Sequence, residues 1–281
     1  MSKKHIKFLA YPLSFLTLTV MVISSFSAVL GEVNAESKTS KITSSKYDFN
    51  GDKKNDNLAV QFTKDYDYTG YKLTVGSKSI TVKNDYFYSA KVEQLDINKK
   101  DKFKEVVISV SSDNDYQYMY IYRYDGKNLR QIGKLPGGRV HNSGNVSFVG
   151  DGTIKTYDRL DILGTFNYQP RYKIDEKKQS LVMIKEKSYL VLDKQQATVI
   201  KPFKAYSSIT SKTPTITLQK GDKITRIGTD AKQWIQCKTQ KGKVVWIKAA
   251  AEDPKSEWLF YCLIDGYGDM NEYLEGFGFY G

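Results

Sequence analysis

Oxygen-bearing side chains are regularly spaced in the segment that runs from Asp48 to Asp56. Asp48, Asn50, Asp52 and Asp56 stand at its first, third, fifth and ninth positions, and Gly51 stands at the fourth. Calcium takes about 6–8 oxygen ligands, and a tightly turning loop can direct alternate side chains and a backbone carbonyl at one point. The spacing is therefore typical of a loop that binds a hard cation.

The residues that follow this loop exclude the helical calcium sensors. An EF-hand needs a bidentate Glu at position twelve and a helix after it, whereas position twelve here is Ala59. Leu58, Val60 and Phe62 alternate with more polar or smaller neighbours, which predicts a β-strand. The loop therefore leads into a strand.

A weaker copy of the loop begins about 48 residues later, a period typical of propeller blades. An apolar strand follows this copy too. One residue is inserted, the Gly is missing, and Lys100 stands where an oxygen ligand would be needed. The oxygen donors of this second loop are Asp96, Asn98, Asp101 and Glu105.

The first loop resembles the Asp-x-Asn-Gly-Asp-x-x-x-Asp signature of the FG-GAP and VCBS repeats of integrin-like β-propellers. The resemblance covers residues 47–135 and implies blade-like repeats with a structural calcium ion. The calcium ligands that it implies are Asp48, Asn50, Asp52, Asp56 and the carbonyl of Lys54. The second loop would be a weaker metal site, formed by Asp96, Asn98, Asp101 and Glu105.

The rest of the chain also predicts strands. From Tyr47 to residue 187, short alternating segments are separated by turn signals such as Asp125-Gly126 and Asp151-Gly152, and no helical period persists. We therefore expect an all-β protein. Its first module, residues 47–187, would be a partial propeller-like assembly.

Residues 188–250 form a second, strongly basic module with twelve Lys or Arg and three Asp. A Lys220-Gly221 turn, a Trp234-Ile235 strand and a strand running from Gly242 to Ile247 resemble a bacterial SH3-like (SH3b) domain. Residues 205–213 replace a segment common in that family. The resemblance implies a small barrel that binds cell-wall peptide or glycan through Trp234 and Trp246. The alternative is that both Trp side chains belong to the barrel core or rim.

The first 35 residues have the features of an export signal. Lys3, Lys4 and Lys7 precede an apolar run from Phe8 to Leu30, and Val33-Asn34-Ala35 fits the small-x-small cleavage rule. An uncleaved membrane anchor is the alternative, because the apolar run is long. Residues 36–46 are polar and predict a flexible leader.

The chain of 281 residues carries a formal net charge of +12, which favours an anionic partner or a lysine-rich solvated surface. For an exported protein, anionic wall polymers fit better than nucleic acid. The tail, residues 251–281, is acidic and aromatic, and we expect it to pack on the barrel. Cys237 and Cys262 could form one disulfide or remain thiols.

Catalytic patterns are scarce. His141 is the one His after the leader, there is no Gly-x-Ser-x-Gly elbow, and turn chemistry accounts for Asp158 and Asp161. Alternate tyrosines from Tyr116 to Tyr124 share one face of a strand, either exposed for sugar stacking or buried under a neighbouring blade. We therefore expect a non-enzymatic, secreted or wall-associated protein of a Gram-positive-type surface. An accessory wall hydrolase, or another enzyme of unidentified class, is the alternative.

Overall fold

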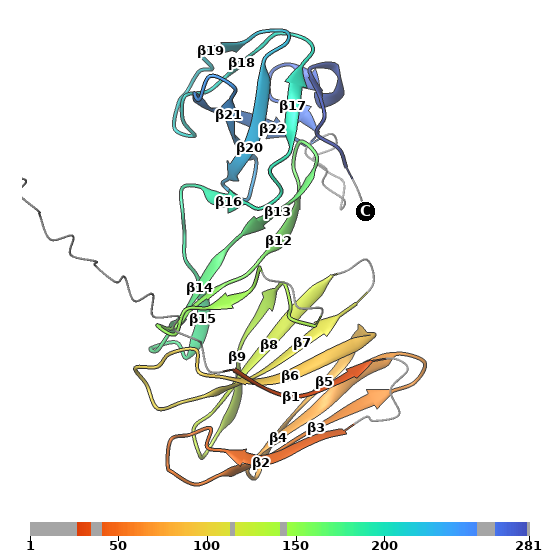
Figure 1. Cartoon of the computed structure of the whole chain (residues 1–281), viewed down its shortest axis with the longest axis vertical. Helices are drawn as coiled ribbons and strands as arrows, with labels where there is room; N and C mark the ends of the chain where they lie inside the picture. The colour runs from red at the N-terminus through yellow and green to blue at the C-terminus, as the bar shows by residue number, and fades with distance from the viewer. Residues whose placement is uncertain (1–26, 35–40, 113–115, 141–144, 252–261, 280–281) are drawn as a thin grey trace, which may run out of the picture.

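The computed structural model describes residues 27–34, 41–112, 116–140, 145–251 and 262–279 (Figure 1). The prediction of an all-β protein is confirmed. Within the described residues the one helical element is a short 3-10 turn, Met270–Glu272. None of the described helical structure is long and apolar enough to cross a membrane.

Three antiparallel sheets are stacked in the N-terminal part. The first sheet has the order β2-β3-β4-β5 and consists of β2 (Lys41–Tyr47), β3 (Asp56–Lys64), β4 (Tyr68–Val75) and β5 (Lys78–Phe87). The second has the order β1-β6-β7-β8-β9 and consists of β1 (Ser27–Asn34), β6 (Ser89–Leu95), β7 (Glu105–Ser111), β8 (Gln117–Tyr124) and β9 (Leu129–Pro136). The third has the order β10-β11-β14-β15 and consists of β10 (Ser147–Phe148), β11 (Thr153–Lys155), β14 (Arg171–Asp175) and β15 (Ser180–Met183).

The second sheet is the middle layer, because it contributes buried apolar side chains to two separate cores. One core joins it to the first sheet, where Tyr71 and Tyr122 place their hydroxyls 2.6 Å apart. The other core joins it to the third sheet through residues such as Met119 and Ile154. The alternate tyrosines of β8 from Tyr120 to Tyr124 lie in the core between the first two sheets. Most of the tyrosine series from Tyr116 to Tyr124 is therefore buried.

Strand β1 pairs with β6 over its whole length and lies at the edge of the middle sheet. Val33 is 3% exposed and belongs to the core between the first two sheets. Residues 27–34 of the expected export signal therefore have a place in the fold, whereas residues 1–26 lie outside the described part. The expected leader also differs, since Lys41–Tyr47 forms β2 and buries Ile42.

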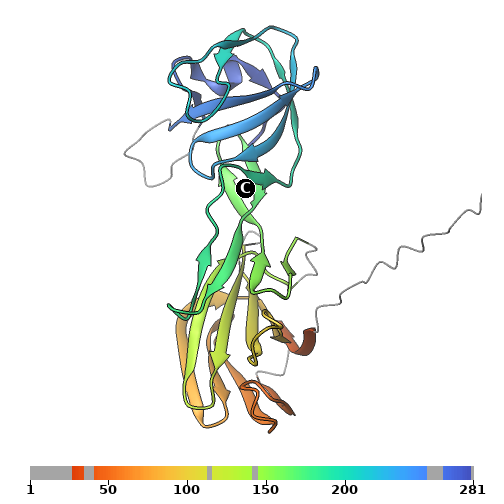
Figure 2. The same cartoon turned by 90° about the vertical axis from the view of Figure 1, so that its left-hand side faces the viewer.

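A long hairpin connects the stack to the C-terminal barrel (Figures 1 and 2). Its base is β11 with β14, and its outer part is β12 (Asp158–Asp161) with β13 (Thr165–Gln169). The outer part joins the barrel sheet, because β13 pairs with β16 (Tyr189–Val191). A boundary at residue 187 therefore does not separate the two cores: the apolar hairpin tip lies in the barrel core.

Arg226 fixes this tip from inside the barrel, where its side chain is fully buried. It donates to the carbonyls of Leu163 at 3.0 Å and Thr165 at 3.2 Å. The rings of Phe166 and Phe277 lie on the guanidinium at 4.2 and 4.3 Å. Leu163 has a left-handed φ of 49°, a strained conformation that persists only where surrounding contacts hold it.

The barrel is built mainly from one curved sheet and a two-stranded ribbon, β18 (Phe203–Ala205) with β19 (Ile216–Leu218). Its other strands are β16 (Tyr189–Val191), β17 (Gln196–Val199), β18 (Phe203–Ala205), β19 (Ile216–Leu218), β20 (Lys223–Thr229), β21 (Trp234–Thr239) and β22 (Val244–Ala250). The tail adds β23 (Leu263–Ile264), β24 (Gly268–Asp269) and β25 (Leu274–Glu275). Strand β25 pairs with β17, and Leu274 and Phe277 are buried in the barrel core; residues 252–261 lie outside the described part.

Candidate functional site

The first oxygen-rich loop joins β2 to β3 and is closed around Asp48. The carboxylate of Asp48 accepts from the backbone N–H groups of Gly51 and Lys53, each at 2.7 Å, and of Asn50 and Asp52, each at 3.2 Å. Gly51 and Lys53 have left-handed φ angles of 71° and 68°, which let the chain curl back over the carboxylate. Burial raises the pKa of Asp48, but these four donors outweigh it and lower the pKa below its usual value.

The remaining donors of the loop are held in the same way. Asn50 Oδ1 accepts from Asp52 N at 2.9 Å, and Asp52 Oδ1 accepts from Lys54 N at 2.8 Å. Asp56 Oδ2 accepts from the N–H of Phe49 at 2.9 Å, and Phe49 is fully buried. The loop is therefore anchored in the core at its second residue and closed by its last acid.

The acids of the loop are close enough to repel one another. Burial raises the pKa of Asp56, the hydrogen bond from Phe49 lowers it, and the charges of Asp52 and Asp48 raise it again, so that the net shift is upward. Among the described residues, no group of three or more His, Cys, Asp or Glu side chains is arranged to hold a metal ion. A calcium ion here would need the amide of Asn50 and a backbone carbonyl as well as carboxylates, a donor set that suits calcium.

The second loop joins β6 to β7 and repeats this construction, but its cation is an arginine. Glu105 Oε2 accepts from Ile97 N at 3.3 Å, as Asp56 accepts from Phe49 in the first loop. Arg123 contacts Glu105 at 2.7 Å and Asp101 at 3.2 Å. Its third partner is Glu176 at 3.1 Å. The positive charge among the acids of this loop is thus the guanidinium of Arg123. A metal ion could bind these acids only by displacing that guanidinium.

Arg123 and Glu105 are almost completely buried, at 1% and 0% exposed. Burial raises the pKa of Glu105 to about 7, although the charge and hydrogen bonds of Arg123 lower it. Asp96 and Asn98 stay outside this ion pair: Asn98 Nδ2 donates to Asp101 at 3.2 Å, and the buried Asp96 Oδ1 has no hydrogen-bond partner among the described residues. Sequence reasoning missed Arg123, whose signal was a lone charge on the apolar face of β8.

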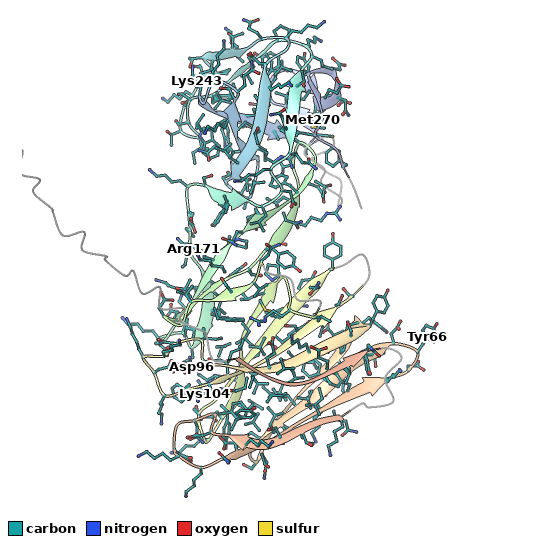
Figure 3. The ribbon with its side chains drawn as sticks, in the orientation of Figure 1. Tyr66, Asp96, Lys104, Arg171, Lys243 and Met270 are labelled. Carbon is teal, nitrogen blue, oxygen red and sulfur yellow. The ribbon has the colours of Figure 1, made fainter. Side chains whose placement is uncertain are left out.

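The β2–β3, β6–β7 and β10–β11 loops, one from each sheet, lie next to one another. Lys104 N donates to the Phe49 carbonyl at 3.1 Å, which joins the second loop to the first. Gly152 N donates to the Ile97 carbonyl at 2.9 Å, and Lys99 N donates to the Gly150 carbonyl at 3.0 Å. Figure 3 shows Asp96 and Lys104 at this end of the stack. The third loop is only a short Gly-Asp-Gly turn, which the sequence had indicated as a turn.

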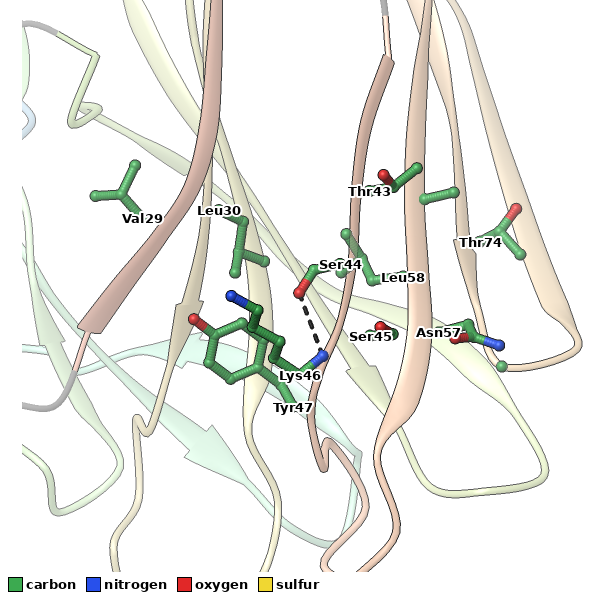
Figure 4. A pocket seen from close by; sticks show the side chains of 12 residues that line it. Val29, Leu30, Thr43, Ser44, Ser45, Lys46, Tyr47, Asn57, Leu58 and Thr74 are labelled. Atoms are coloured by element: carbon green, nitrogen blue, oxygen red, sulfur yellow. Dashed lines mark hydrogen bonds between the residues drawn. The ribbon is translucent and has the colours of Figure 1, made fainter.

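A groove with a volume of about 580 Å³ lies beside β1 (Figure 4). Val29 and Leu30 of β1 line one side, and residues of β2, β3 and β4 line the other. Most of that second side is small and polar, and Lys46 N donates to Ser44 Oγ at 3.4 Å. The groove follows the open edge between the first two sheets, and its described lining residues include no Asp, Glu or His.

In the barrel, Trp234 and Trp246 lie on one face of the β21–β22 pair. Trp246 is paired with Gln236, and Gln236 shares a face of β21 with Trp234, two residues earlier. They are 8% and 7% exposed, so only their edges reach the surface. Tyr206 covers them: its ring meets that of Trp234 at 4.9 Å, and its backbone forms a bridge to Trp246. The segment of residues 205–213 therefore begins on top of both Trp residues.

Exposed lysines gather at one end of the barrel. The N–H of Gln240 donates to the Lys223 carbonyl at 2.9 Å, and the N–H of Thr239 donates to the Lys243 carbonyl at 2.8 Å, which brings two turns together. Figure 3 places Lys243 on the outer part of the barrel. In the described residues the tail pairs its acids with other lysines, Lys201 and Lys248. The members of this basic end are Lys220, Lys223, Lys238, Lys241 and Lys243, all exposed.

No disulfide joins Cys237 to Cys262. The side chain of Cys237 points into the barrel core and is fully buried, because β21 faces the core at this position. Burial raises the pKa of its thiol to about 12. Such a thiol is an unreactive core residue rather than a nucleophile.

The remaining acidic pair, Asp158 and Asp161, is used within the connecting hairpin. Tyr168 donates to Asp158 at 3.3 Å, and burial raises the pKa of Asp158. Thr165 and Arg159 both contact Asp161. These contacts stabilise the hairpin, and His141 lies outside the described residues.

Comparisons of the chain with protein-family profiles, curated proteins and solved structures find no match.

Proposed function

We propose that this chain is an exported, non-enzymatic protein that binds an anionic cell-wall or cell-surface polymer through the basic end of its barrel. The exposed lysines of that end carry the proposal. Two turns present five positive charges together, and the acid beside them, Asp222, is engaged by the N–H of Gln219 at 2.8 Å. Clustered charge of one sign attracts a polymer of the opposite sign and raises its association rate.

The proposal also assigns a class to each module. The N-terminal stack would be a short series of propeller-type repeats, supported by three stacked antiparallel sheets whose β2–β3, β6–β7 and β10–β11 loops lie side by side. The barrel would be an SH3-like wall-binding module, in which Trp234 and Trp246 offer their edges beneath Tyr206. A calcium ion held by Asp48, Asn50, Asp52, Asp56 and the Lys54 carbonyl would neutralise the repelling acids of the first loop and act structurally.

Sedimentation with purified cell walls, with and without their teichoic acid, tests the binding. The full chain should pellet with intact walls, less with stripped walls, and less as salt rises, because salt screens exposed charges. Lys241→Gln/Lys243→Gln should pellet several-fold less. Lys177→Gln/Lys178→Gln removes the same charge from the exposed β14–β15 turn and should behave as the native chain.

Two results would contradict the proposal. Equal pelleting of the two double variants would show that the basic end has no special part in binding. Release of muropeptides from the walls would instead indicate a wall hydrolase.

A further inference from the structure

A second candidate site lies at the other end of the stack from the oxygen-rich loops. A cleft of about 360 Å³ is lined by Tyr86, Tyr88, Tyr116 and Tyr118, together with Asp67. In Figure 3, Tyr66, the neighbour of Asp67, marks this end, whereas Asp96 and Lys104 mark the opposite one. The volume falls within the range of about 300–1,000 Å³ that is usual for small-molecule sites.

The tyrosines of this cleft are more exposed than the tyrosines of the core. Tyr86, Tyr116 and Tyr88 are 68%, 42% and 38% exposed, whereas Tyr120 and Tyr122 on β8 are buried. Large aromatic side chains gathered at the surface of a soluble protein mark a binding site more often than chance packing. The first two tyrosines of the series from Tyr116 to Tyr124, Tyr116 and Tyr118, are therefore the ones available to a ligand.

The cleft is also held in place by its surroundings. Tyr88 N donates to the Ser111 carbonyl at 2.9 Å, and Ser112 N donates to the Tyr116 carbonyl at 2.9 Å. The ammonium of Lys134 lies 4.5 Å from the centre of the Tyr118 ring. Because Tyr has few rotatable bonds, such rings offer a large contact area at a small entropic cost.

We propose that this cleft binds a neutral β-linked glycan. The tyrosine rings offer flat apolar faces and hydroxyl rims, which match the flat CH face and the hydroxyl rim of a pyranose ring. Among the described lining residues Asp67 is the charged one; it can accept hydrogen bonds from sugar hydroxyls, and its charge disfavours an anionic ligand. The site is therefore distinct in chemistry from the basic end of the barrel.

A titration of the full chain with N-acetylchitotetraose and with cellotetraose, followed by NMR and calorimetry, tests this site. The native chain should bind at least one of these probes below about 10 mM. Tyr86→Ala and Tyr116→Ala should each weaken binding about fivefold to tenfold, the effect of losing one aromatic contact. Tyr86→Phe keeps the ring and should bind within about threefold of the native chain.

Tyr66→Ala is the matched control, because Tyr66 is 90% exposed at the same end but does not line the cleft. Binding should not depend on salt and should persist in Lys241→Gln/Lys243→Gln, so that failure of the barrel proposal leaves this one standing. No binding of either probe, or equal binding by the Ala variants and the native chain, would overturn it. Chemical-shift changes at these tyrosines with wall stem peptides but not with sugars would overturn it too.

Discussion

Replacing Arg123 with Met should destabilise the protein strongly and in a pH-dependent way. Arg123 is 1% exposed, and its main partner, Glu105, is fully buried. Removal of one partner of a buried ion pair typically costs about 3–5 kcal/mol, because an uncompensated charge is left in the interior. We expect a loss of this size near pH 8, where Glu105 would otherwise be ionised.

The pH dependence follows from the pKa of Glu105. In the folded protein burial raises this pKa from 4.5 to about 7. Because the folded state holds the proton more tightly, the stabilising contribution is complete below pH 4.5 and is lost as pH rises through about 7. Arg123 lowers the pKa of Glu105, so Arg123→Met should raise it further and extend the loss above pH 7. Near pH 5 the carboxyl is neutral in both proteins, and the variant should lose only about 1–2 kcal/mol in hydrogen bonds.

Urea unfolding between pH 5 and pH 8, followed by circular dichroism, measures both effects. Arg130→Met is the control, since Arg130 pairs with Asp125 at the surface and is 37% exposed. An exposed pair of this kind contributes about 0–1 kcal/mol at any of these pH values. In the double variant Arg123→Met/Glu105→Met much of the stability should return, because apolar packing can replace a buried ion pair. A loss that is equal at pH 5 and pH 8, or no larger than that of the control, would refute this account.

Three further outcomes are expected. A calcium chelator should lower the melting temperature of the native chain but not of Asp52→Asn, as differential scanning calorimetry would show; an unchanged native midpoint would argue against the calcium ion. A chain that begins at Glu36 lacks β1, so it should lose roughly 2 kcal/mol or more of apolar burial and self-associate through the open edge of β6, visible in urea melts and sedimentation velocity. A fragment 188–281 lacks the hairpin tip and should not fold, whereas 153–281 should give the dispersed NMR spectrum of a folded barrel; equal dispersion would show that the tip is dispensable.

Local patterns were sufficient for the class of fold and for the first loop. Alternating apolar residues and Gly-containing turns specify strands without information from the rest of the chain, and the spacing from Asp48 to Asp56 places the loop before β3. The ion pair in the second loop was not accessible in this way. Glu105 and Arg123 are 18 residues apart and become neighbours only through the register of β7 and β8, where they are directly paired.

For a related reason, the sequence could not predict which sheet the connecting hairpin joins. Strands β12 and β13 have the same local signals whether they close the third sheet or join the barrel. What decides is the barrel core, in which Leu163 and Phe166 are fully buried and Arg226 finds carbonyl partners. A composition change near residue 188 therefore locates the basic module but not the limit of its core.

The three loops at one end of the stack all join neighbouring sheets, but they differ in the charges that they contain. They connect β2 to β3, β6 to β7 and β10 to β11, and each contacts its neighbour through backbone hydrogen bonds. The first has several acids and a donor set suited to calcium, the second has a guanidinium among its acids, and the third is a turn too short to need either. The second loop thus keeps its stacking contacts with a guanidinium as the positive charge among its acids. It follows that calcium at the first loop, where it is proposed, would stabilise the stack, whereas ligand binding would depend on the basic end of the barrel and the tyrosine cleft.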